Sequence, residues 1–263
     1  MIVLVANFWA ALLFSTLWFT ETKPVPWDSV WQPVLIGFLY ILGQSLTFLA
    51  LEHGDVSVAA PVLSTKIVAV AVLLVAISGE RLSTVLWAAV VMAMGGIILV
   101  QRTDQPTQRD RLLWSIAFAL AAATTFALFD VLVQDIANWA PKWGSGHFLP
   151  ILFWVGALAS LAYLPLIDHS KWKTPGLKLP LFTGTLCIGL QALCIVCTLA
   201  YFGDAARVNV VYALRGLWGV VLAWMFASRF DMQEQHLSRN TMLTRLMGAI
   251  LLTAAVIMAL VFK

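Results

Sequence analysis

Two basic residues deep inside apolar segments are the most informative chemical feature of this sequence. Lys66 and Arg215 lie about ten and about nine residues into long apolar runs, which is roughly 14–15 Å at the rise of an α-helix. A Lys or Arg at the centre of a membrane helix costs about 2.5–3.5 kcal/mol on insertion scales, so it normally faces a cavity or a partner. We therefore predict that both cations face a central cavity and bind an anionic substrate, such as a carboxylate or a phosphorylated or sugar-acid metabolite.

The alternative is that the protein neutralises these cations itself, with carboxylates or with carbonyl groups at helix ends. Asp130 is the only acidic residue clearly inside an apolar run, about 7 Å from the end of that run. One carboxylate cannot neutralise two cations, so the charge balance favours the anion site slightly. Internal pairing of the cations stays open.

Several polar residues are candidates for the walls of the same cavity. Asn209 and Tyr212 precede Arg215 by six and three residues, which places the three on one helical face. Gln44 and Gln191, from two other apolar runs, are further hydrogen-bond donors, although bonding to a neighbouring helix explains each of them as well. The predicted substrate site comprises Lys66, Arg215, Tyr212, Asn209, Gln44, Gln191 and Asp130.

The elements that must position these residues are membrane-spanning helices. Apolar residues make up 61% of the chain and charged residues 11%, against about 25% charged in a typical soluble domain. A hydrocarbon core of about 30 Å needs roughly 20 apolar residues in a helix, and backbone groups in lipid must bond internally. The sequence predicts an all-α polytopic bundle of about nine transmembrane helices, near residues 2–20, 32–52, 56–78, 84–101, 112–134, 146–167, 179–203, 206–227 and 241–262.

Other functional classes find little support in the sequence. The net charge of +3 comes without a Lys/Arg-rich run, so we expect no nucleic-acid partner. Cys187, Cys194 and Cys197 share one apolar run and are expected to be small buried hydrophobic residues. Metalloprotease, serine-hydrolase and phosphate-loop motifs are missing, so we expect neither an enzyme nor a cofactor.

The expected partners are the lipid bilayer of the cell membrane and a small molecule. A membrane-embedded enzyme or a lipid-handling protein with a buried cationic site is the alternative function.

An internal repeat relates the two basic residues. Eleven positions separate Asp55 from Lys66 and also Asp204 from Arg215, and the second pair follows the first at an offset of 149 positions. The runs that contain them are the third and the eighth. Because the eighth run comes five positions after the third, an odd number, the two copies cross the membrane in opposite directions and predict an inverted repeat. Chance similarity between two apolar helices is the alternative.

The same repeat predicts two domains and two helix caps. Residues 1–102 are expected to form the first repeat with four spans, in which the first helix of five is missing, and residues 112–263 the second repeat with five spans. A protein with nine spans by nature is the alternative. Asp55 and Asp204 stand at helix starts, where a carboxylate accepts free N–H groups and favours the helix dipole. Pro61 should allow a bend in the third helix.

The segment from Ala50 to Val100 resembles the third to fifth helices of EamA-like members of the drug/metabolite transporter superfamily. The shared features are a small-residue helix with a central Pro61, a Gly79-Glu80 link and a last helix that contains Gly95-Gly96. Residues 200–261 match the family more loosely, without a Pro in the corresponding helix or a Glu in the Arg229-Phe230-Asp231 link. The resemblance implies ten helices in two inverted repeats and the export or exchange of metabolites, without naming a substrate.

Overall fold

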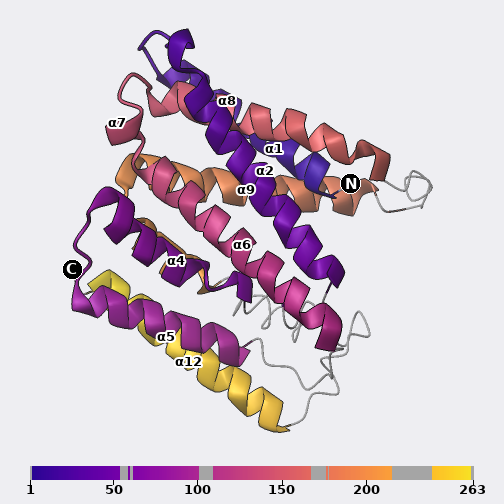
Figure 1. The fold of residues 1–263 in the computed structure, drawn as a ribbon, viewed down its shortest axis with the longest axis vertical. Coiled ribbons are helices and arrows are strands. Elements are labelled where there is room, and N and C mark those ends of the chain that lie inside the picture. Colours follow the sequence, from indigo (N-terminus) through magenta and orange to yellow (C-terminus); the bar gives the residue numbers. More distant parts are fainter. Residues whose placement is uncertain are drawn as a thin grey trace. The chain divides into compact units, whose positions relative to one another are not determined.

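The structure is a computed structural model, and it describes residues 2–53, 59, 62–100, 109–166, 176, 178–214 and 239–261. Within these ranges every regular element is a helix (Figure 1). The chain divides into two compact units, one made of Met1–Leu42 and Leu132–Gly203 and the other of Gly43–Val131 and Asp204–Lys263. Each unit therefore combines segments that are far apart in the sequence.

The first unit contains three long helices. α1 (Ile2–Ser15) continues into the 3-10 helix η1 (Thr16–Thr20), and α8 (Ser145–Ala159) continues into η4 (Ser160–Leu166). The third is α9 (Lys178–Phe202). The unit also includes η2 (Trp27–Ser29), the first part of α2 (Trp31–His53) and the short α7 (Ile136–Trp139).

Aromatic stacking and small residues hold this first unit together. The rings of Phe14 on α1 and Phe153 on α8 stack with their centroids 3.8 Å apart, and both side chains are buried. On α9, a Cβ atom at Gly189 would lie 3.2 Å from the backbone nitrogen of Ala10. The missing side chain therefore lets α9 approach the backbone of α1, as small residues do in membrane helix pairs.

The second unit contains the rest of α2, most of α6 (Arg109–Gln134) and four further helices: α4 (Lys66–Leu73), α5 (Thr84–Val100), α10 (Ala205–Tyr212) and α12 (Arg239–Val261). α4 continues into a π-helical turn, η3 (Leu74–Ser78). Gly79 ends this turn in the left-handed conformation, with φ of 66°, which glycine adopts without a steric penalty. The predicted Gly-containing link is thus a helix stop.

Five helices in the described ranges are long and apolar enough to cross a membrane: Ile2–Thr20, Trp27–His53, Leu113–Gln134, Ser145–Pro165 and Lys178–Phe202. They confirm the first, second, fifth, sixth and seventh predicted spans. The shorter apolar helices Lys66–Ser78, Thr84–Val100 and Leu246–Val261 fall within the third, fourth and ninth, while the eighth is described only up to residue 214. The protein is therefore an integral, multi-pass membrane protein, and the total of nine helices stays a prediction.

Two glycines set the closest helix pair of the second unit, α5 and α12, which lie side by side (Figure 1). A Cβ atom at Gly96 would be 2.9 Å from the carbonyl oxygen of Gly248, and one at Gly248 would be 2.6 Å from the carbonyl oxygen of Gly96. Neither position has room for a side chain, because backbone atoms of the opposite helix, which cannot move aside, are among the nearest atoms. The pair depends on close backbone contact.

This contact yields a matched pair of variants. Gly96→Val should lower the thermal unfolding midpoint in detergent, since overpacking a tight contact costs about 1–3 kcal/mol. Gly95→Val has the same effect on helix propensity but meets no atom within 4 Å, so we expect a much smaller change. Equal losses for the two variants would contradict the role assigned to the α5–α12 contact.

Candidate functional site

A buried ion pair forms the centre of the candidate site, in the second unit. The Nζ atom of Lys66, the first residue of α4, lies 2.7 Å from Oδ2 of Asp130 on α6. The Lys66 side chain is 21% exposed, whereas that of Asp130 is only 4% exposed. The lysine is thus the accessible partner and the carboxylate is enclosed by protein.

Asn209 on α10 supplies a second donor to the same carboxylate. Its Nδ2 donates to Asp130 Oδ2 at 2.7 Å and to the carbonyl oxygen of Ala205 at 2.9 Å, one helical turn earlier. Burying a carboxylate is strongly unfavourable unless it is paired and hydrogen-bonded. The ammonium and the amide together meet that requirement and connect three helices. We name this group the Lys66–Asp130–Asn209 cluster.

An aromatic ring forms part of the surroundings of the lysine. Phe126 lies one helical turn before Asp130 on α6, and the ammonium of Lys66 is 5.9 Å from the centroid of its ring. This distance is within the range of a cation–π interaction. A Cβ atom at Gly43 on α2 would be only 2.9 Å from the Phe126 ring, so a glycine is what lets the ring lie there.

A turn precedes Lys66 on its helix, and another turn follows the end of α10. Before Lys66, residues 64 and 65 form a turn, in which both the backbone N–H and the hydroxyl of Thr65 donate to the carbonyl oxygen of Val62. α10 ends at Tyr212, and Ala213 forms a turn two residues before Arg215. Backbone polar groups freed by such interruptions are tolerated at membrane depth only inside protein or at a water-filled cavity.

The structure brings together three of the seven predicted site residues, namely Lys66, Asp130 and Asn209. Gln44 and Tyr212 are half-buried in the same unit, and each has other interactions. Gln191 is exposed on α9 of the first unit. Arg215 lies outside the described residues, as do Asp55 and Pro61. Roles for Gln44, Tyr212, Gln191 and Arg215 in the site stay predictions.

Lys66 is paired with a carboxylate of the protein itself, Asp130. This is the alternative that the sequence left open. Sequence reasoning identified the lysine and the acid separately but did not pair them, because their helices are far apart in the chain. It also missed Phe126. The spacing of four residues between Phe126 and Asp130 places both on one face of α6, and this was the available signal.

The predicted helix cap at Asp204 is confirmed. Its carboxylate accepts a hydrogen bond from the backbone N–H of Arg207 at 3.3 Å and also binds the Arg207 guanidinium. Asp204 has a positive φ of 64°, so it turns the chain as well as capping α10. The pairing accounts for both charges at this helix start.

The expectation that the three cysteines are buried is wrong. Cys187 and Cys194 are exposed and Cys197 is half-buried on α9. The outer surface of a spanning helix meets lipid, so a small apolar side chain has no need of a protein core there.

In the ranges that the structure covers, no group of three His, Cys, Asp or Glu residues is placed to hold a metal ion.

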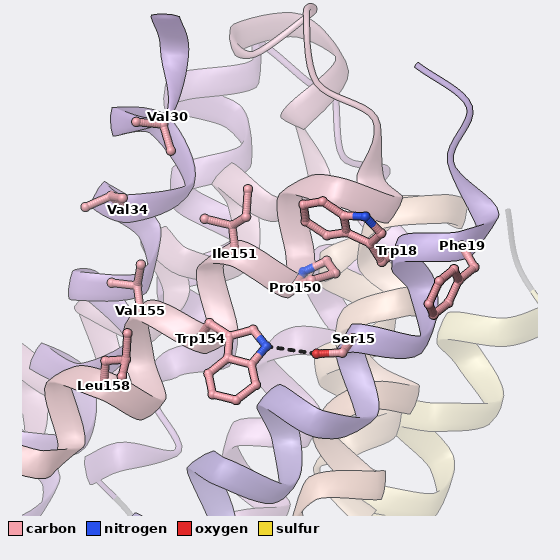
Figure 2. Close-up of a pocket in the computed structure, with 10 residues that line it drawn as sticks. All are labelled: Ser15, Trp18, Phe19, Val30, Val34, Pro150, Ile151, Trp154, Val155 and Leu158. Carbon is pink, nitrogen blue, oxygen red and sulfur yellow. Dashed lines mark hydrogen bonds between the residues drawn. The ribbon is translucent and has the colours of Figure 1, made fainter. Parts of the chain in front are cut away.

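A cavity lies within the first unit, among α1, η1, α2 and α8 (Figure 2). Its volume is about 570 Å³, and it is lined by Ser15, Trp18, Phe19, Val30, Val34, Pro150, Ile151, Trp154, Val155 and Leu158. The polar side-chain groups in this wall are the Ser15 hydroxyl and the two indole N–H groups, and Trp154 Nε1 donates to Ser15 Oγ at 2.8 Å. A wall without charge suits hydrocarbon and provides nothing to hold an anion.

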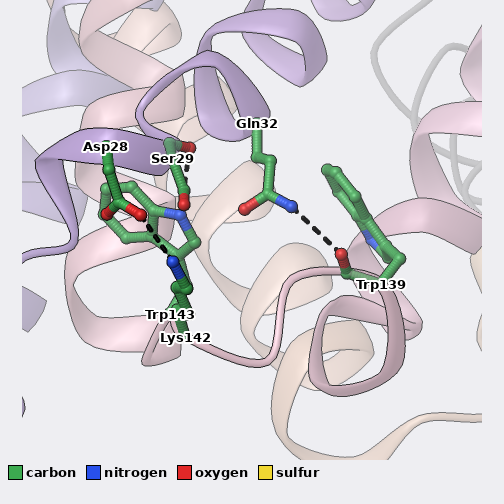
Figure 3. A network of polar contacts seen from close by, with 6 residues as sticks. All are labelled: Asp28, Ser29, Gln32, Trp139, Lys142 and Trp143. Atoms are coloured by element: carbon green, nitrogen blue, oxygen red, sulfur yellow. Dashed lines mark hydrogen bonds and ion pairs between the residues drawn. The ribbon is translucent and has the colours of Figure 1, made fainter.

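A polar network joins two segments at one end of the first unit (Figure 3). Its contacts are the Asp28–Lys142 ion pair, a hydrogen bond of 3.2 Å from Trp143 Nε1 to the Ser29 carbonyl, and one of 3.0 Å from Gln32 Nε2 to the Trp139 carbonyl. The ion pair is 63% and 62% exposed. These contacts fix the start of α2 against the segment between α7 and α8.

Comparisons with known proteins agree with the family resemblance. Residues 1–102 match the EamA-like transporter family, which confirms the resemblance to EamA-like members of the drug/metabolite transporter superfamily. No curated protein matches the chain. A solved structure titled "Crystal structure of protein" is 14% identical, covers 100% of this chain and 89% of its own, and has a TM-score of 0.68. At this identity the likeness shows a shared fold alone.

The ion pair predicts a pattern of stabilities. Asp130→Leu or Lys66→Met alone leaves a charge without its partner, and we expect losses approaching the about 3–5 kcal/mol seen when one member of a buried pair is removed. The double variant removes both charges and should recover most of the loss. Thermal unfolding in detergent measures all three proteins.

The exposed Asp28–Lys142 pair is the control for this experiment. Because both of its side chains are more than half exposed, Asp28→Leu should change the unfolding midpoint much less than Asp130→Leu. A double variant at residues 66 and 130 that loses the sum of both single losses would contradict the pairing.

Proposed function

We propose that this protein, whose residues 1–102 match EamA-like transporters, is a secondary transporter of a small anionic metabolite in the cell membrane. Transport would proceed by alternating access between two inverted repeats. The observation that carries the proposal is the Lys66–Asp130–Asn209 cluster, because ionisable groups inside membrane helices are expensive and mark substrate or ion pathways. The family match indicates a membrane transporter, and the cluster supplies a site for its substrate.

The charge balance of the predicted spans supports an anionic substrate. Lys66 and Arg215 contribute two positive charges, and Asp130 contributes one negative charge. Since Asp130 is bound to Lys66, these three groups together carry a net charge of +1. In a low-dielectric environment an uncompensated positive charge attracts an anion much more strongly than it does in water.

The helix interruptions support the inverted repeat. The turn at residues 64–65 immediately precedes Lys66, and the turn at Ala213 recurs 149 positions after Ser64, the same offset that relates Lys66 to Arg215. Discontinuous helices in corresponding positions of two halves are typical of transporter binding sites. We propose that residues 1–102 and 112–263 are the two repeats, with the pair of interrupted helices at the substrate site.

The alternative function, a lipid-handling protein or a membrane-embedded enzyme, also has an observation in its favour. The uncharged cavity of the first unit, with a volume of about 570 Å³, suits an acyl chain. In that case Lys66 would serve only to hold helices together, and it would not be reached from water. Water access to the lysine therefore separates the two functions.

Transport by purified protein in proteoliposomes tests the anion site. Lys66→Ala and Arg215→Ala should each abolish uptake of anionic metabolites, because each removes a charge that would bind the substrate. Both variants should still insert and purify as single species. Lys142→Ala removes an exposed lysine of the first unit and should transport at nearly the wild-type rate. Normal transport by both substrate-site variants would end the proposal.

Cysteine labelling tests water access to the cluster. In a background with Cys187, Cys194 and Cys197 replaced by Ser, Ala69→Cys places a thiol one helical turn after Lys66. We expect it to react with a membrane-impermeant thiol reagent in lipid vesicles. Val72→Cys, at an exposed apolar position on the same helix, should be protected by lipid. Protection of both positions would favour the alternative function.

A further inference from the structure

The cavity of the first unit lies within membrane-spanning helices and begins near the end of two of them (Figure 2). All of its lining residues belong to three helices that are long and apolar enough to cross a membrane: Ile2–Thr20, Trp27–His53 and Ser145–Pro165. Phe19 is the last residue but one of the first helix, and Val30 is close to the start of the second. The cavity is therefore surrounded by hydrocarbon, and one end of it lies close to the membrane surface.

The third helix starts at the same end of the unit. A Cβ atom at Gly146, near the start of α8, would be 2.9 Å from the carbonyl oxygen of Leu17. Just before α8, Trp143 Nε1 donates to the carbonyl oxygen of Ser29 at 3.2 Å. Indole side chains prefer the level of the lipid headgroups. The exposed tryptophans at this end are Trp18, Trp27 and Trp31.

The cavity has the shape of a narrow channel along α8. Its lining residues on this helix form one stripe at a spacing of about one turn, from Pro150 to Leu158, over which the helix rises about 12 Å. The volume of about 570 Å³ is typical of a ligand pocket. Spread over that length, it leaves a channel narrower than an α-helix, which is about 10–12 Å across with its side chains. One extended chain fits there, whereas a partner helix does not.

The chemistry of the wall suits hydrocarbon. None of the lining residues is charged, and the hydroxyl of Ser15 accepts the hydrogen bond of Trp154 Nε1. An apolar cavity stays dry, and an empty one loses the dispersion contacts of its wall. An acyl chain restores these contacts. Trp18, at the surface end, brings an N–H donor to the level at which the ester carbonyl groups of a phospholipid lie.

We propose that this cavity binds one acyl chain of a bilayer phospholipid, which stays with the protein and stabilises the first unit. The chain enters from the level of the headgroups and follows the stripe on α8, so that it contacts α1, α2 and α8 together. A lipid on the outer surface of a single helix lacks this three-sided contact. The inference does not depend on anion transport. It differs from the alternative function because the lipid is a resident component and not a cargo.

The charges at the surface end give no basis for selecting a headgroup. Glu21 and Lys23, in the loop between the first two spans, have opposite signs. Asp28 is bound to Lys142. This loop and this ion pair therefore provide no excess of positive charge that would favour an anionic headgroup. We expect zwitterionic and anionic phospholipids to bind alike, because the acyl chain is what the site recognises.

Thermal unfolding of the full-length protein in detergent tests the inference. The added probes are phosphatidylcholine, phosphatidylglycerol and glycerophosphocholine, which is a headgroup without acyl chains. A ligand of the folded state raises the unfolding midpoint, so either phospholipid should raise it by at least about 2 °C. Glycerophosphocholine should leave it unchanged. Native mass spectrometry should detect one phospholipid retained by the protein after extensive washing with detergent.

A matched pair of variants assigns the lipid to the cavity. Val34 lines the cavity on α2 (Figure 2), so Val34→Trp should fill part of it and abolish both the retained lipid and most of the midpoint rise. Leu35, the next residue, is exposed and lies outside the lining, so Leu35→Trp should behave like the wild type. If Val34→Trp does not fold, Ile151→Trp narrows the cavity from α8 and takes its place.

Several results would overturn the inference. The first is a wild-type protein that retains no phospholipid and gains no stability from either one, whatever the variants do. The second is a folded Val34→Trp or Ile151→Trp variant that keeps both the lipid and the midpoint rise. An equal rise with glycerophosphocholine would assign the binding to the headgroup and contradict the role of the chain. Anion uptake in proteoliposomes is a separate measurement, so failure of the lipid site and failure of the proposed function are distinguishable.

Discussion

The burial of a carboxylate in a membrane-spanning unit is the constraint on which the candidate site depends. Asp130 can remain ionised there only with partners, and they come from two other helices: Lys66 from α4 and Asn209 from α10. Losing any one of the three groups therefore affects all three helices. An ion pair that holds helices together is also sensitive to any further charge that approaches it in a low-dielectric environment.

The rest of the packing relies on the absence of side chains. Gly96 and Gly248 let α5 and α12 touch through their backbones, and Gly189 does the same for α9 and α1. Lipid tails are as apolar as leucine, so hydrophobic burial does little to hold helices together within a membrane. Close backbone contact and a few polar groups take its place. This accounts for a chain in which many large apolar residues remain exposed, such as Phe19 and Phe202.

Much of the fold was predictable because a membrane helix can be recognised from the length and the apolar composition of its segment. Spans such as α2 and α9 follow from apolar runs whose ends the structure reproduces to within a few residues. The chemistry at Lys66 was predictable from its depth alone. Its pairing with Asp130 was not, because residues 64 apart in sequence meet only through the arrangement of helices, which periodicity does not encode. The cysteines were misjudged for a related reason, since a soluble-protein rule for burial was applied to a surface that meets lipid.

The π-helical turn at Leu74–Ser78 closes its helix, because the backbone N–H groups of Gly79 and Glu80 both donate to the carbonyl oxygen of Leu74. Gly79 adopts a left-handed conformation at this point, which lets the chain leave the helix in a new direction. A residue with a side chain would be strained there. The place where the helix of Lys66 stops is therefore set by one glycine, away from the ion pair itself.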